Sequence, residues 1–172
     1  MFDINNSRDF YAKLLADFDD YLENQNSARH AMNCAITAHH MHDWIWVDFL
    51  KKDKRLRDSL GIGSKLNDFV RWIDTRTVWF RVVQNISNGS KHFVRDSAVG
   101  TERVAGYGHG AYGLGPYGEG YLAFDMWPGD SEARYIPVAF LLEVLIRFWR
   151  DFFRQCGRGE DLPVGKYALS EP

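Results

Sequence analysis

Apolar residues recur every three or four positions along five stretches of this chain, and this spacing predicts five helices. In the first stretch Phe10, Leu14 and Phe18 fall on one face of a helix. The second stretch is the longest. Its first half carries alanines at helical spacing, which let a neighbouring helix approach closely, and its second half carries bulky side chains. The five predicted helices cover residues 7–24, 27–50, 64–73, 77–93 and 138–155.

Between the fourth and the last predicted helix the pattern changes to short strands. We expect these strands at residues 98–105, 121–126 and 133–136, the last two forming a β-hairpin. The segment Gly106 to Gly120 contains seven Gly in fifteen residues, which predicts a flexible loop or flap.

The predicted fold is therefore mainly α. We expect a single domain over residues 1–172, a bundle of about five helices, in which the Gly-rich loop and hairpin (residues 97–136) are inserted before the last helix. After Arg158 the helical pattern ends, and we expect a loose tail.

Composition and charge narrow the class of protein. The chain has 172 residues, of which 45% are hydrophobic and 26% are charged, as in ordinary globular proteins. Its net charge of -2 excludes a positive electrostatic field over the whole molecule that would attract nucleic acid. The net charge does not exclude a local basic patch. The two Cys are too few for a disulfide framework. No run of about 18 apolar residues is present and no secretory signal is visible, so we expect a cytoplasmic protein without a membrane span.

One local basic patch lies at the end of the second predicted helix. Five of the seven residues from Lys51 to Arg57 are basic. Cations suit the negative end of a helix dipole, so this stretch is interpreted as a solvated helix end. A phosphate-binding patch is the alternative.

A row of polar residues on the fourth predicted helix is the most informative feature for function. Arg81, Asn85, Asn88 and His92 are spaced by four, three and four residues, which places them within about 60° of one another around a helix. Asn and His form helices less well than Glu, Lys or Gln. We therefore expect this row to face a cleft or a dimer seam. The alternatives are an ordinary solvent face, or a helix that ends at an Asn88–Gly89 cap before His92.

The segment from Ser87 to His92, which reads S-N-G-S-K-H, resembles the motif of the HEPN superfamily of small helical-bundle domains. In that family an Arg is followed by a polar residue, often Asn, then by three variable residues and a His. Asn88 and His92 stand at the polar and the His positions, and Ser87 stands where the Arg is expected. The resemblance covers roughly residues 7–96 and 138–155.

The resemblance implies RNA cleavage without a metal, at a site that two subunits share. It implies that the His acts as general acid or base and that the Arg holds a phosphate group. Because Ser87 replaces the Arg, we expect a protein that binds RNA or nucleotides and has weak or no RNase activity. The candidate catalytic residues are His92, Asn88 and Arg81, and the candidate binding residues are Asn85, Lys91, His39 and His42.

Two other functions stay open at this point. His39 and His42 share a helix face and could supply two ligands to a metal, with His92 or Asp74 as the third. We expect instead that the two histidines contact the core or the row of polar residues on the fourth predicted helix, and we predict no metal and no cofactor. The other alternative is a non-catalytic homodimeric interaction module whose Gly106–Gly120 loop contacts a protein partner.

Overall fold

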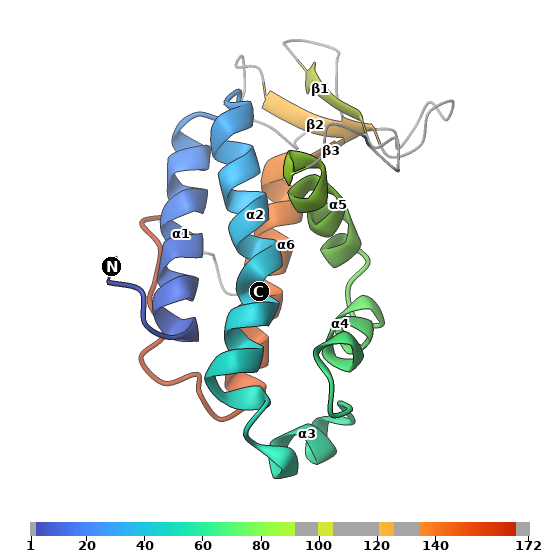
Figure 1. Ribbon diagram of the computed structural model, residues 1–172. Helices are drawn as coiled ribbons and strands as arrows, with labels where there is room; N and C mark the ends of the chain where they lie inside the picture. Colours follow the sequence, from blue (N-terminus) through green and yellow to red (C-terminus); the bar gives the residue numbers. More distant parts are fainter. Residues whose placement is uncertain (1–2, 92–99, 105–120, 126–134, 168–172) are drawn as a thin grey trace.

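The computed structural model describes residues 3–91, 100–104, 121–125 and 135–167. In these ranges the chain is mainly helical, with a small antiparallel sheet before the last helix, so the predicted fold class is confirmed (Figure 1). The elements are α1 (Ser7–Glu23), α2 (Ala28–Ile45), the π-helical η1 (Trp46–Leu50), α3 (Lys54–Leu60), α4 (Leu66–Asp74), α5 (Trp79–Lys91), β1 (Gly100–Val104), β2 (Tyr121–Asp125), β3 (Tyr135–Pro137) and α6 (Val138–Gln155).

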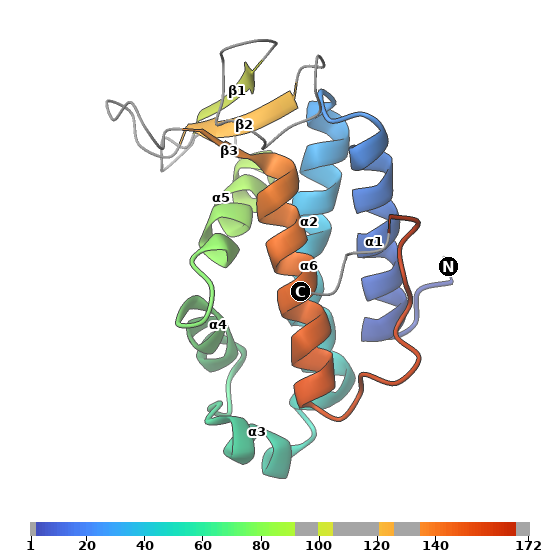
Figure 2. The ribbon, with the colours of Figure 1, turned by 180° about the vertical axis from the view of Figure 1, so that it is seen from behind.

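Three long helices, α1, α2 and α6, lie side by side and form the body of the bundle (Figures 1 and 2). α5 and α4 follow one another along one side, α3 lies at one end, and the sheet lies at the other. The centre of the core is fully buried and comes from all three long helices, as Leu14, Ile45 and Trp149 show. Each such side chain contributes about 1.5–3 kcal/mol by leaving water.

The alanines of α2 do allow close packing. Ala35 and Ala38 are buried, and the indole Nε1 of Trp149 on α6 donates a hydrogen bond to the backbone oxygen of Ala38 at 3.0 Å. The predicted helix over residues 27–50 is α-helical only to Ile45, after which the chain continues as the π-helical η1.

The basic stretch after η1 contains a helix that the hydrophobic pattern did not predict. Asp53 caps the start of α3, since its Oδ1 accepts a hydrogen bond from the backbone N–H of Leu56 at 2.9 Å. The guanidinium Nη1 of Arg57 donates to the backbone oxygens of Leu50 at 2.7 Å and Lys51 at 2.6 Å. Arg57 therefore satisfies carbonyls at the end of η1, in line with the helix-end interpretation of this stretch.

α5 continues through Asn88 and Gly89 to Lys91, the last residue described in this part of the chain, so the alternative of a cap at Asn88–Gly89 is wrong. The break expected between the third and fourth predicted helices is present, because α4 ends at Asp74 and α5 begins at Trp79.

The sheet is antiparallel, with strand order β1-β2-β3. All three predicted strands are present, within a few residues of their expected ends. The middle strand is tied to the bundle, since the backbone N–H of Leu122 donates to the oxygen of Gln25 at 3.1 Å and Leu122 and Phe124 belong to the main core. The predicted flexible loop Gly106–Gly120 lies outside the described residues.

The expectation of a loose tail after Arg158 is wrong for residues 159–167. This segment runs back along α1 (Figure 2). The carboxylate of Asp19 accepts the backbone N–H groups of Lys166 at 2.7 Å and Tyr167 at 3.3 Å, and Arg8 donates to the oxygen of Glu160 at 2.7 Å. These contacts with α1, which is far away in the sequence, hold the segment in place, and the hydrophobic pattern of the sequence does not reveal them.

Among the helices that the structure describes, none is both long and apolar enough to cross a membrane.

Candidate functional site

The residues of the HEPN-like motif point to different sides of α5. Ser87 is fully buried, whereas Asn88 is exposed. Arg81 and Asn85 are exposed as well, and these three residues, Arg81, Asn85 and Asn88, form what we call the polar face of α5. At 100° per residue, Ser87 lies about 120° around the helix from Arg81. Arg81 therefore cannot take over the position that Ser87 occupies.

The polar face lies at the surface of the chain. The side chain of Arg81 is 69% exposed and its Nη2 forms an ion pair with Asp74 at 2.8 Å. The expectation that Asn88 is partly buried is wrong for the single chain, because side chains at this angle of α5 point away from α2 and α6. The prediction that the polar face of α5 lies at an interface between two copies of the chain stays a prediction. His92 and the side chain of Lys91 lie outside the described part of the chain.

His39 and His42 of α2 point into the protein, which confirms that they contact the core. Their exposed fractions are 6% and 5%, and their ring centroids are 4.9 Å apart. Both rings pack against Phe80 of α5, at centroid distances of 5.4 Å and 5.3 Å. The two histidines thus form part of the contact between α2 and α5.

The protonation of His42 follows from its contacts. Its Nδ1 lies 2.6 Å from the backbone oxygen of His39. Because a carbonyl oxygen only accepts, Nδ1 carries the proton and donates. Burial lowers the pKa of His42 below its usual value, although the hydrogen bond to His39 and the charge of Asp43 oppose this shift. His42 is therefore a neutral imidazole near neutral pH.

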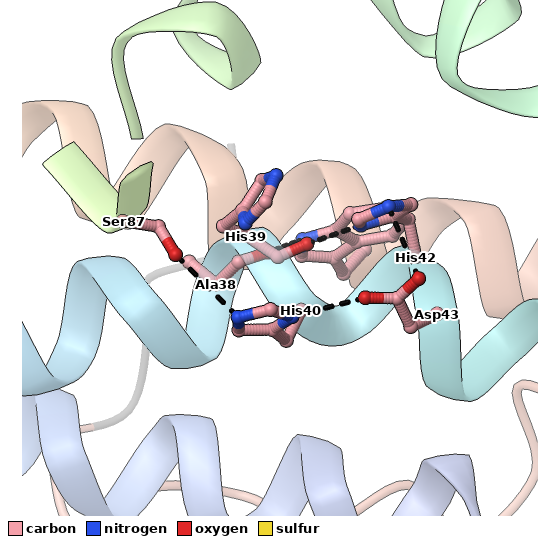
Figure 3. Close-up of polar contacts among 7 residues, drawn as sticks. Ala38, His39, His40, His42, Asp43 and Ser87 are labelled. Atoms are coloured by element: carbon pink, nitrogen blue, oxygen red, sulfur yellow. Dashed lines mark hydrogen bonds and ion pairs between the residues drawn. The ribbon is translucent and has the colours of Figure 1, made fainter. Parts of the chain in front are cut away.

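A third histidine, His40, links α2 to α5. Its Nδ1 lies 2.9 Å from Oδ2 of Asp43, and its Nε2 lies 3.4 Å from the hydroxyl oxygen of Ser87 (Figure 3). The sequence suggested no Ser-His-Asp combination. The spacing of His40 and Asp43 on one helix face is visible in the sequence, but the contact with Ser87, 47 residues away, depends on how α5 packs.

The connectivity Ser87–His40–Asp43 has the order of a catalytic triad. A nucleophile must also reach its substrate, and the fully buried Ser87 has no exposed surface. We therefore assign these three residues a role in joining two helices. Solvent reaches the other two residues of this chain of contacts, since the side chains of His40 and Asp43 are 28% and 41% exposed.

Metal ligation by His39 and His42 finds little support in their surroundings. No group of three or more His, Cys, Asp or Glu side chains that could hold a metal ion occurs among the described residues. Nδ1 of His42 is occupied by the His39 carbonyl, and Asp74, a suggested third ligand, is paired with Arg81.

The two cysteines are also unsuited to nucleophilic chemistry. Burial raises the pKa of Cys34 well above its usual value and that of Cys156 to about 12. Both side chains are therefore neutral thiols at physiological pH, and the thiolate is the reactive form.

We compared the chain with models of protein families, with curated proteins and with solved structures, and found no match in any of the three comparisons.

Proposed function

We propose that this chain is a HEPN-like helical domain that binds RNA or nucleotides through the polar face of α5, and that it cleaves RNA weakly or not at all. The observation that supports this proposal is that the residues of the motif lie on different sides of α5. Asn88 is available to a ligand, while Ser87, at the position of the phosphate-holding Arg, is buried.

The polar face offers suitable chemistry for a phosphate backbone. A guanidinium group can bind two phosphate oxygens at once, and amide side chains supply both donors and acceptors to sugars and bases. A phosphate that reaches Arg81 has to compete with Asp74 for its guanidinium group. Asp74 is only 21% exposed, so a phosphate that displaces it from Arg81 leaves a largely buried carboxylate without this partner, which weakens the binding.

Gly89 supports a contact surface on α5. It lies inside the helix, where Gly costs about 1 kcal/mol relative to Ala. A Cβ built on Gly89 meets nothing within 4 Å, so packing within the chain does not require Gly. The close approach of a ligand or a second subunit is a physical reason for a Gly at this position.

The absence of strong cleavage follows from the burial of Ser87. A hydroxyl group cannot neutralise a phosphate, and the loss of one well-placed charge at a transition state costs about 3 kcal/mol, or roughly a hundredfold in rate. Arg81 is on a different side of α5 and does not replace it.

Fluorescence anisotropy with a short labelled single-stranded RNA tests the binding. We expect Arg81→Gln to weaken the affinity and to reduce the dependence of log K on log salt by about one unit. Arg55→Gln, an equal charge change on the exposed face of α3, is the matched control and should bind as the wild type does. Equal weakening by both variants, or no binding by the wild type, would contradict the proposed surface.

Gly89→Ala separates packing from binding. We expect this variant to be more stable by up to about 1 kcal/mol and to bind RNA more weakly. A gain in stability with unchanged affinity would remove Gly89 from the proposed contact surface.

The catalytic part of the proposal needs its own assay. Wild type and His92→Ala are incubated with the same RNA, and we expect little cleavage by either. Efficient cleavage by the wild type that disappears in His92→Ala would show that the domain is an active RNase.

A homodimer belongs to the proposal, because the resemblance implies a site shared by two subunits. Light scattering coupled to gel filtration should give twice the monomer mass. A monomer at every concentration tested would leave the polar face of α5 as a surface of the single chain.

A further inference from the structure

A pocket of about 300 Å³ lies between α1, α6 and the segment 159–165. Its lining residues belong to α1, α6 and this segment and none belongs to α5, so it is separate from the site discussed above. Tyr11 and Leu15 of α1 line one wall, and Arg150 and Arg154 of α6 line another. Its volume is at the lower end of the range of small-molecule sites.

Two cations project into this pocket from one face of α6. Arg150 and Arg154 are four residues apart, so their side chains are neighbours on the helix. The Nε of Arg150 is buried and makes no hydrogen bond to any residue that the structure describes. Arg154 is 51% exposed and forms an ion pair with Asp151 at 3.7 Å, and Arg147 on the same helix is paired with Glu143. A buried donor without an acceptor is costly, and an acceptor from a ligand would satisfy it.

Tyr11 lies in the wall of the pocket beside the two arginines. Its side chain is 1% exposed, and its hydroxyl makes a long contact of 3.4 Å with the backbone oxygen of Ile146. Burial raises the pKa of Tyr11 to about 12, while the charges of Arg150 and Arg154 lower it. The hydroxyl is thus neutral and close enough to both guanidinium groups to feel their charge.

The segment over the pocket is built to lie close to α6. A Cβ on Gly159 would be 2.5 Å from Cγ and 3.0 Å from Cα of Arg154, so this approach requires Gly. Asp161 has a positive φ of 54°, which is uncommon for a residue other than Gly. Leu162, Pro163 and Val164 then add an apolar wall.

We propose that this pocket binds a small organic anion, whose carboxylate or phosphate group contacts Arg150 and Arg154 and whose short apolar part packs against Leu15, Leu162 and Pro163. Paired guanidinium groups suit both kinds of anion, because each offers several donors in a fixed plane. This ligand site does not depend on the function proposed for α5.

Calorimetric titration of the full chain with butyrate, butyl phosphate and inorganic phosphate tests the site and distinguishes the kinds of anion. We expect saturable binding of at least one organic anion, tighter than that of inorganic phosphate because of the apolar wall. Arg150→Gln should weaken it by at least about tenfold, as expected for the loss of a charge-assisted hydrogen bond. Arg55→Gln, which changes the charge equally outside the pocket, should bind as the wild type does.

Two further measurements keep the test independent of folding defects. Val164 is 79% exposed, so Val164→Trp can fill the pocket from its outer side without changing the core, and it should abolish binding. In a nitrogen-15 spectrum the Nε–H signal of Arg150, assigned by its loss in Arg150→Gln, should shift on titration. Absence of saturable binding by all three probes, or equal binding by wild type, Arg150→Gln and Val164→Trp, would overturn the proposal.

Discussion

At the scale of single residues, Ser87 decides what the motif on α5 can do. Its side chain is fully buried and its hydroxyl faces His40 at 3.4 Å. Replacing it by Arg would restore the sequence of the HEPN-like motif. It would also place a large cation in a space that holds only a hydroxymethyl group. The sequence alone suggests a gain of activity from this change, and the packing of α5 argues against it.

We predict that Ser87→Arg destabilises the protein by several kcal/mol, since it combines overpacking with the burial of a charge. Urea unfolding followed by tryptophan fluorescence measures this loss. Ser87→Ala, which removes the hydroxyl group and its contacts, should cost about 1 kcal/mol or less. A Ser87→Arg protein that unfolds at the wild-type urea concentration and cleaves RNA would show that the helix can turn this position outward.

At the scale of elements, Arg57 joins the end of η1 to α3. Arg57 donates to the carbonyl oxygens of Leu50 and Lys51, and its guanidinium group lies 5.9 Å from the ring centroid of Trp46. Hydrogen bonds from a charged donor contribute more than neutral ones. The basic stretch thus contains one structural cation among exposed ones such as Arg55.

We predict that Arg57→Gln lowers the free energy of unfolding by about 1.5–3 kcal/mol, because two carbonyls at the end of η1 lose their donor. Arg55→Gln should change it by less than about 0.5 kcal/mol, as an exposed substitution does. Chemical denaturation of both variants checks this difference. An equal effect of the two substitutions on the free energy of unfolding would contradict the structural role of Arg57.

At the scale of the whole molecule, α2, α5 and α6 meet around a cluster of aromatic rings. His39 and His42 pack on Phe80, and Phe80 packs on Trp149 with a centroid distance of 6.2 Å. A charge that appears on His42 would therefore disturb three helices at once. This makes the stability of the fold sensitive to acid.

We predict that stability falls as the pH drops below about 6.5, the pKa of an unperturbed histidine. The folded protein holds His42 at a lowered pKa, so the unfolded chain takes up the proton first and unfolding is favoured. The contribution of His42 is complete above that pH, and the loss below it is at most about 1.4 kcal/mol per pH unit. Urea unfolding between pH 5 and pH 8, the range in which histidine titrates, should show a shallower pH dependence for His42→Gln. An unchanged slope in the variant would contradict the assignment.

The helices and strands were largely determined by the sequence. The apolar spacing placed α1 within one residue at its end and α6 without error, because a helix that packs against a core must repeat its apolar positions with the helical period. The strands before α6 were equally visible. α3 was missed because it is short and only two apolar residues, Leu56 and Leu60, pack against the core from it, which is too few to stand out as a hydrophobic period.

Only the tertiary structure decided which side chains meet. The row of Arg81, Asn85 and Asn88 is readable from spacing alone, but spacing does not say that Ser87 is turned inward onto His40. Likewise, the sequence predicts a loose tail at residues 159–167. In the structure the carboxylate of Asp19 on α1 accepts hydrogen bonds from this segment, which places it beside Arg150 and Arg154 of α6. Local periodicity determines an element, because the neighbours of a residue in a helix are set by the backbone. The pocket and the His40–Ser87 contact join residues far apart in the chain, and their positions depend on how the helices pack.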